Sequence, residues 1–212
     1  TAPMQIFLNG LEDAFTNAPW PIIMLLLLGV VWLGSRQWKT VLGTAIAMLL
    51  IGIFGLWEDT MTTLAMVTVA TLIAVLIGLP LGILMARSDR FQSFLSPVLD
   101  LMQTMPSFVY LIPVVVIFGI GKVPGLIAVV IYAVPPMIRL TNLGIRLVDR
   151  EVIEAADAFG ASRKQKLFGV QLPLSLPTIM TGVNQTIMMS LSMVVVASME
   201  GVATPTWFSL PI

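Results

Sequence analysis

The chain has 212 residues, of which 58% are hydrophobic and only 10% are charged, whereas soluble domains have roughly 45–50% apolar and 25% charged residues. This composition excludes a water-soluble surface, and the balance of 11 basic and 11 acidic residues gives no sign of a nucleic-acid partner. The absence of cysteine and histidine from the sequence excludes zinc sites, iron–sulfur clusters, disulfides and Cys–His or Ser–His catalysis.

Six apolar runs approach the roughly 20 residues that a helix needs to cross a bilayer. In chain order they are Trp20–Leu33, Val41–Trp57, Met61–Ala86, Pro97–Ile120, Pro124–Leu143 and Leu174–Met199. Because lipid offers the backbone no hydrogen-bond partner, each run is expected to be helical. The sequence therefore predicts an all-α integral membrane protein with about six membrane helices, the first of them short. The opening stretch carries Glu12 and Asp13 where a signal peptide would be basic, so we expect no removable signal peptide.

The connections between these runs alternate in the sign of their charge. Acidic and basic pairs follow one another at Glu12 and Asp13, Arg36 and Lys39, Glu58 and Asp59, and Arg87 and Arg90. The connection after the fifth run is strongly basic, and basic connections stay in the cytoplasm. This pattern predicts that the N-terminus is outside the cell and that the long polar connection is cytoplasmic.

That polar connection, Gly144–Gln171, is predicted to contain a short helix of its own over residues 151–160. Asp149 is expected to cap the N-terminus of this helix, and Gly160 is expected to end it in the left-handed conformation. Ser162 is expected to cap a second, basic turn. One face of the helix is apolar and contains small residues that let a partner backbone approach closely, namely Val152, Ala155, Ala156 and Phe159.

The same connection contains a spaced Glu-Ala-Ala pattern. Glu154-Ala155-Ala156 is followed after three residues by Gly160, and after nine more by Val170-Gln171-Leu172-Pro173. This spacing resembles the EAA loop of the permease subunits of type I ABC importers, with Val170 in place of an isoleucine. In that family the loop seats on a cytoplasmic ATPase, so the resemblance implies a coupling role for Glu154, Ala155, Ala156, Phe159, Gly160, Leu172 and Pro173. The alternative is an ordinary amphipathic connector.

Two further stretches, residues 99–113 and 133–139, resemble permeases for glycine betaine, choline and proline betaine, and the similarity covers about residues 61–199. The resemblance implies a transport subunit, not an enzyme, in a bacterial or archaeal cell (inner) membrane. Its implied partners are cytoplasmic ATPase subunits that bind ATP and Mg, an extracytoplasmic substrate-binding protein, a second permease copy and membrane lipid. The chain itself is expected to bind no cofactor, because residues 119–123 lack the first glycine and the hydroxyl of a phosphate-binding loop.

The predicted organisation has three parts. Residues 1–60 form an N-terminal tail with two accessory membrane helices, and residues 61–199 form the permease core with its coupling loop at about 144–173. Residues 200–212 form an atypical tail whose prolines and brevity argue against another span. Members of the family continue with one further core helix, so the resemblance implies that this helix is missing here.

Candidates for the translocation path are helix breaks, aromatic rings and polar groups within the apolar runs. They are Pro106, Tyr110, Pro135, Asn184 and Gln185. Packing kinks are an equal alternative for the prolines. Asp100 and Arg139 are functional hypotheses because ionisable groups are costly within a bilayer. One interpretation is that Asp100 and Arg139 pair with each other, and the other is that the Arg139 side chain extends to the membrane interface.

Two rival functions are weighed against an ATP-driven importer. An ion-gradient-driven secondary transporter or channel remains an alternative, although the sequence has no duplicated pattern of broken helices. A membrane-embedded enzyme is disfavoured, because the charges within the apolar runs are too few and too scattered to form a catalytic pair.

Overall fold

The computed structural model describes residues 6, 10, 13–15 and 20–199, and the secondary structure of this part is helical. The described residues form two compact units, one ending at Val67 and the other starting at Thr68. The prediction for residues 200–212 and the contribution of Glu12 to the predicted orientation concern residues outside the described part.

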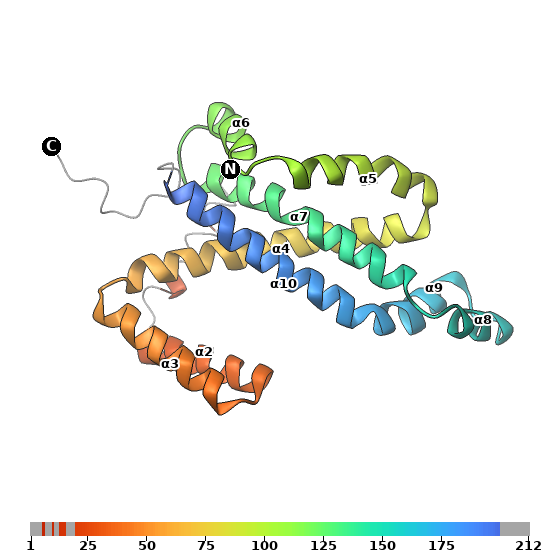
Figure 1. The fold of residues 1–212 in the computed structure, drawn as a ribbon, viewed down its shortest axis with the longest axis horizontal. Helices are drawn as coiled ribbons and strands as arrows, with labels where there is room; N and C mark the ends of the chain where they lie inside the picture. The colour runs from red at the N-terminus through yellow and green to blue at the C-terminus, as the bar shows by residue number, and fades with distance from the viewer. Residues whose placement is uncertain (1–5, 7–9, 11–12, 16–19, 200–212) are drawn as a thin grey trace. The chain divides into compact units, whose positions relative to one another are not determined.

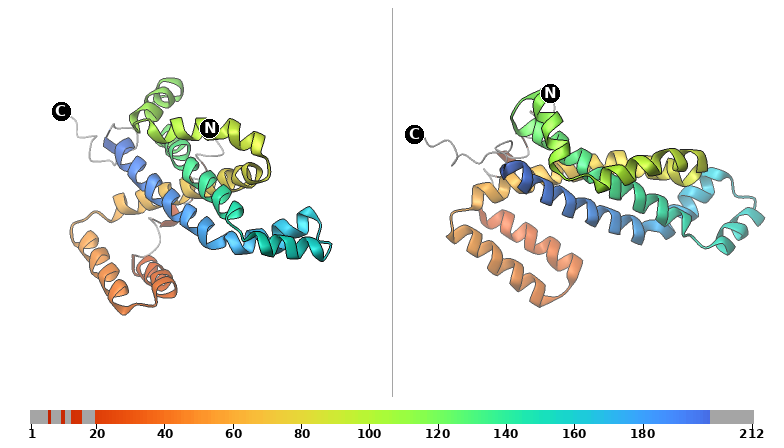
Figure 2. Two further views of the ribbon diagram at one scale, coloured as in Figure 1. Left: turned by 45° about the vertical axis from the view of Figure 1, so that its right-hand side comes forward. Right: turned by 45° about the horizontal axis from the view of Figure 1, so that its top comes forward.

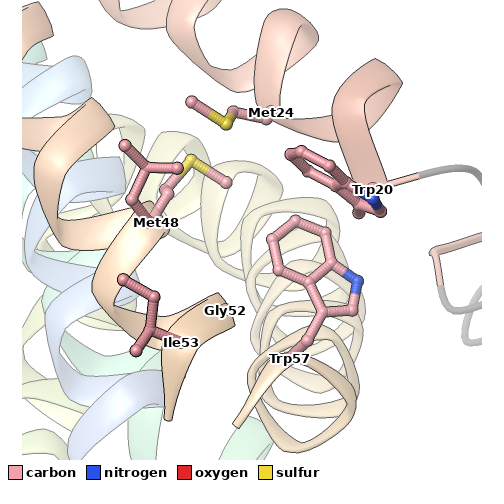
Figure 3. Close-up of a pocket in the computed structure, with 7 residues that line it drawn as sticks. Trp20, Met24, Met48, Gly52, Ile53 and Trp57 are labelled. Carbon is pink, nitrogen blue, oxygen red and sulfur yellow. The ribbon is translucent and has the colours of Figure 1, made fainter. Parts of the chain in front are cut away.

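The first unit contains a pair of apolar helices, α2 (Trp20–Ser35) and α3 (Trp38–Ile53), which pack against each other. The second predicted run extends to Trp57, but α3 ends at Ile53 because Gly55 adopts a left-handed φ of 72°. Figure 3 shows an apolar pocket of about 470 Å³ beside these helices, with Trp20, Met24, Met48 and Trp57 around it.

Helix α4 (Trp57–Arg87) begins in the first unit and continues into the second. The other elements of the second unit are α5 (Asp89–Thr104), α6 (Phe108–Phe118), α7 (Lys122–Arg146), α8 (Arg150–Ala158), α9 (Arg163–Lys166), the π-helical turn η1 (Leu167–Gln171) and α10 (Leu172–Met199). Helices α7 and α10 lie side by side in all views of Figures 1 and 2, and α5 and α6 also contact α7. Helix α7 is therefore the centre of this unit.

Small residues allow the helices of the second unit to approach closely. A Cβ placed on Gly82 of α4 would lie 2.5 Å from the Cβ of Thr141 on α7. A Cβ placed on Gly144 of α7 would lie 2.9 Å from the Cβ of Thr178 on α10. Because lipid tails are as apolar as the side chains, such close packing is a main source of helix association in membranes.

By length and apolar composition, three described helical segments can cross a membrane: α4, α7 and the continuous segment Arg163–Met199. The bent pair of α5 and α6 is a fourth candidate, and α2 and α3 are shorter, with 16 residues each. Each of the six predicted apolar runs thus contains helix.

The predicted run Pro97–Ile120 is wrong as a single helix. It belongs to α5 and α6, whose axes differ by 95°. The break lies at Met105, which has the extended conformation that a residue before proline prefers, and Pro106 offers no backbone N–H. Helix α5 also begins before Pro97, because Ser88 caps it by accepting a hydrogen bond from the backbone N–H of Phe91 at 3.3 Å.

Candidate coupling helix and transport cavity

The local structure of the Glu-Ala-Ala segment agrees with its sequence signals. The Asp149 carboxylate accepts a hydrogen bond from the backbone N–H of Glu151 at 3.0 Å, which confirms the predicted N-cap of α8. Gly160 has a φ of 74°, which confirms the predicted left-handed end. Ser162 caps α9 in a capping box with Gln165, in which each side chain accepts from the other residue's backbone N–H.

Helix α8 has no buried residue, although it carries apolar side chains. Phe159 is 93% exposed and Val152 is 40% exposed. Glu154, Ala155 and Gly160 are also exposed, and Ala156 is half-buried. In Figure 1, α8 lies beyond the ends of α7 and α10. The apolar face predicted from the sequence is thus uncovered by the rest of the described chain.

An ion pair ties α8 to the segment that leads into α10. Lys166 Nζ on α9 pairs with the carboxylate of Asp157 on α8, and the Lys166 side chain is only 21% exposed. From α9 the chain continues through η1 into α10 as one helical segment up to Met199. Helix α8 is therefore connected to α10 both through the chain and through an ion pair.

Leu172 and Pro173 lie apart from the exposed end of α8. Together with Phe168 and Ile179 they line an apolar pocket of about 230 Å³ at the start of α10. The predicted coupling residues thus fall into two groups, one on α8 and one at the base of α10.

A larger and more polar cavity of about 610 Å³ lies among α4, α5, α7 and α10. Its polar lining comes from α5, α7 and α10 and consists of Gln92, Ser96, Asp100, Gln103, Arg139, Asn142 and Gln185. Such a collection of polar groups between apolar helices is costly against lipid, which marks the cavity as a candidate pathway.

The two ionisable candidates, Asp100 and Arg139, form an ion pair across this cavity, from Arg139 Nη2 to Asp100 Oδ1. Of the two alternatives considered for Arg139, the structure thus shows the pairing. The Arg139 side chain is 36% exposed and the Asp100 side chain is 64% exposed, so the pair is open to the cavity. Arg139 Nε is buried and has no hydrogen-bond partner in the structure.

Two adjacent pathway candidates on α10 have different surroundings. Gln185 lines the polar cavity, whereas Asn184 is exposed and does not line it. Adjacent residues of a helix point about 100° apart, so only one of these two side chains faces the cavity. The prolines of α7 divide in the same way, since Pro135 is fully buried and Pro136 lines the cavity.

The remaining candidates lie at the bend between α5 and α6. Pro106 is exposed there. The Tyr110 hydroxyl donates a hydrogen bond to the backbone carbonyl of Met102, and its ring packs edge-on against Tyr132, with centroids 5.7 Å apart. Tyr110 therefore braces the bend, and the pathway roles of these residues stay predictions.

Two features of the second unit were missed in the sequence. The polar residues of α5 recur at helical spacing, at Gln92, Ser96, Asp100 and Gln103, a pattern that could have been found by testing the charged segment for helical periodicity. Arg146 forms the second feature, because it joins three helices. Its guanidinium donates to Asn142 Oδ1 at 3.1 Å, to the Met85 carbonyl at 3.2 Å and to Asp89 Oδ1 at 2.7 Å.

Comparison with known proteins finds a family match over residues 78–209, to the family described as "Binding-protein-dependent transport system inner membrane component". The chain is 50% identical to the glycine betaine/carnitine transport permease protein GbuB of Listeria monocytogenes, covering 92% of this chain and 71% of that protein. It is 49% identical to the glycine betaine/proline betaine transport system permease protein ProW of Escherichia coli, covering 94% of this chain and 56% of that protein. The chain thus spans little more than half of the second relative.

The fold is also similar to solved structures. Two crystal forms of the MetNI methionine ABC transporter in inward-facing conformations match with TM-scores of 0.59 and 0.58 and identities of 24% and 25%. The matches cover 66% and 73% of this chain, and 71% and 75% of those chains. The described helices therefore have the fold of an ABC importer permease.

Proposed function

Because this chain belongs to the family of binding-protein-dependent transport system inner membrane components, we propose that it is the membrane-spanning subunit of an ATP-driven importer for a quaternary-ammonium compatible solute. The family predicted from the Glu-Ala-Ala spacing is confirmed by this match. The solute class is supported by the names of the two relatives, both of which refer to glycine betaine transport.

We propose the partners that such a subunit needs. Two cytoplasmic ATPase subunits bind ATP and Mg, an extracytoplasmic binding protein delivers the solute, and a second copy of the permease completes the path. The chain lies in the cell (inner) membrane with its N-terminus outside. The basic connection that carries α8 supports this orientation, because basic connections stay in the cytoplasm.

The observation that carries the proposal is the uncovered apolar face of α8. Phe159 directly follows the last residue of a helix rich in charged residues, and it is almost fully exposed. An exposed phenylalanine is costly in water, and the neighbouring charges exclude it from lipid, so we expect a partner protein to cover it. The ATPase seats on Ala155, Ala156 and Phe159 of this face, and it also contacts Glu154 and Gly160 outside the face. Leu172 and Pro173 form the base on which α10 turns.

The mechanism follows from the connections of α8. The helix is joined through residues 147–149 to α7 and through α9 and η1 to α10, and both long helices line the polar cavity. When ATP brings the ATPase subunits together, α8 moves and carries these ends of α7 and α10 with it. The cavity, with Gln185 in its wall, then opens alternately to the two sides. Asn184, Pro106, Tyr110 and Pro135 take part by shaping the path and its bend.

The test places a bulky residue on the docking face. Gly160→Trp and Ala156→Arg are expected to abolish ATP-dependent uptake of glycine betaine in vesicles that contain the permease, the ATPase and the binding protein, while membrane insertion survives. Gly55→Trp is the matched control, because Gly55 and Gly160 are both exposed, have φ values of 72° and 74°, and have no atom within 4 Å of an added Cβ. Normal uptake by the Gly160→Trp variant would contradict the proposed coupling role of this segment.

The rival transport mechanism is tested in the same vesicles. Uptake is expected to stop when the ATPase subunits are left out and to be insensitive to a collapse of the ion gradients when they are present. Uptake that persists without the ATPase and follows an ion gradient would instead identify a secondary transporter.

A further inference from the structure

We propose that Asp100 and Arg139 form a transient binding site for the zwitterionic solute in transit, in which Arg139 binds the carboxylate of the solute and Asp100 faces its quaternary ammonium. This inference rests on the proposed function. In the empty cavity the two side chains neutralise each other, and in the loaded cavity the two ends of the solute take their place.

The position of the ion pair is the first argument. Asp100 and Arg139 come from different helices, α5 and α7, and both line the polar cavity. The cavity volume of about 610 Å³ falls within the roughly 300–1,000 Å³ that is usual for small-molecule sites. The two side chains are 36% and 64% exposed. A solute in the cavity can therefore reach both charges.

The hydrogen-bonding state of Arg139 is the second argument. A guanidinium has five donors in a planar fork that matches a carboxylate with two parallel hydrogen bonds. In the structure Nη2 is paired with Asp100, and Nε is buried without a partner. A rotated guanidinium that presents Nε and one Nη to a carboxylate would satisfy a donor that the ion pair leaves unused. The amide of Gln185, which also lines the cavity, supplies a further donor.

The balance of charge is the third argument, and it determines which solutes the site accepts. Separating this ion pair without replacing its partners leaves two uncompensated charges in a cavity between apolar helices, which is unfavourable. A zwitterion with a carboxylate at one end and a quaternary ammonium at the other compensates both charges at once. Choline has the ammonium but no carboxylate, so it would leave Arg139 without its anion. The site therefore favours glycine betaine over choline.

The sequence contains no cysteine, so one introduced thiol is the only one in these 212 residues. Gln103→Cys places a thiol in the cavity wall. In vesicles with the assembled transporter, we expect glycine betaine to slow the reaction of this thiol with N-ethylmaleimide. Choline is expected to need an at least about tenfold higher concentration for the same protection, as the loss of one charge-assisted hydrogen-bonded pair implies.

A second substitution assigns this preference to Arg139. Adding Arg139→Gln to Gln103→Cys is expected to bring the concentrations of glycine betaine and choline needed for protection to nearly equal values, and Arg139→Lys is expected to give an intermediate ratio. Arg90→Gln, an exposed change on α5 outside the cavity lining, is the control and is expected to keep the full preference. A merely structural role of Arg139 would weaken protection by both solutes in proportion.

The outcomes separate this inference from the proposed function. Equal protection by the two solutes in the Gln103→Cys protein, or a preference that survives Arg139→Gln, would overturn the site. Lack of any protection, in vesicles that still take up glycine betaine with ATP, would also overturn the site and leave the importer intact. Failure of ATP-dependent uptake by the unsubstituted protein would instead overturn the proposed function.

Discussion

Helices α7 and α8 follow one another in the chain, yet the burial of their apolar side chains differs sharply. In α7, 72% of the apolar window is buried by neighbouring helices, whereas no residue of α8 is buried. Both helices contain alanine and branched apolar residues, so composition alone does not explain the contrast. The difference lies in what surrounds them, because other helices of the same unit cover α7 but not α8.

Exposure has a different meaning in different parts of this molecule. The exposed leucines and isoleucines of α2 and α3 need no protein cover if these helices lie in the membrane as the sequence predicts, because lipid solvates apolar side chains. Helix α8 carries Glu151, Glu154 and Asp157 within nine residues and cannot lie among acyl chains. Exposed Phe159 is therefore informative, whereas an equally exposed residue on α3 is not.

The largest effect on folding is expected where the helices approach most closely. Gly82→Leu adds a side chain whose Cβ would lie 2.5 Å from Thr141 Cβ and 2.8 Å from the backbone oxygen of Ile138. Because the neighbouring backbone cannot move aside at little cost, we expect a loss of about 3 kcal/mol or more in the free energy of unfolding. Thermal unfolding of the purified permease in detergent micelles measures this loss.

Gly43→Leu on α3 is the matched control for this change. It adds the same side chain to an apolar helix, where no atom lies within 4 Å of the added Cβ. We expect its melting temperature to stay close to that of the parent protein. If Gly82→Leu melted at the same temperature as Gly43→Leu, close contact between α4 and α7 would not be what stabilises the core.

A smaller effect is expected at Arg146, which joins α4, α5 and α7. Arg146→Gln removes the guanidinium hydrogen bonds to the Met85 carbonyl, Asn142 and Asp89 while keeping a polar side chain. The bond to exposed Asp89 contributes little, so the expected loss is about 1–2 kcal/mol and arises mainly from the Met85 carbonyl and Asn142. Thermal unfolding again provides the measurement, with exposed Arg87→Gln at the end of α4 as the control. A larger loss for the control would show that positive charge, and not this junction, stabilises the helix ends.

The sequence predicted the long helices and α8 well, because their signals are local. Apolar runs located α4, α7 and α10, and Asp149 and Gly160 marked the ends of α8 through backbone chemistry that depends on a few neighbouring residues. The first half of α5 was not identified as helix. A search for apolar runs does not detect a helix that has one polar face.

The candidate cavity was only partly predictable for a related reason. Which of two adjacent residues faces a cavity depends on how the helices are rotated against each other, and tertiary packing sets that rotation. Gln185 and Pro136 line the cavity, while their neighbours Asn184 and Pro135 do not. Likewise, the pairing of Asp100 with Arg139 joins residues 39 positions apart, and no local signal specifies it.

The smallest effect on folding is expected at Phe159, where the contrast between α7 and α8 is sharpest. Phe159 is 93% exposed, so Phe159→Ala should change the free energy of unfolding by less than about 0.5 kcal/mol. The same truncation in a packed core costs about 3–5 kcal/mol. If the ATPase covers Phe159, this nearly silent change should strongly weaken the association of the permease with its ATPase, because buried aromatic side chains dominate binding at interfaces.

Co-purification of the ATPase with each variant, together with thermal unfolding, measures both effects. Phe94→Ala on α5 is the control, because Phe94 is 72% exposed but does not belong to the Glu-Ala-Ala segment. We expect it to retain the ATPase. Retention of the ATPase by Phe159→Ala as well would mean that the exposed ring serves no interface. The uncovered face of α8 would then not mark a docking site, because its most exposed apolar group would contribute nothing to binding.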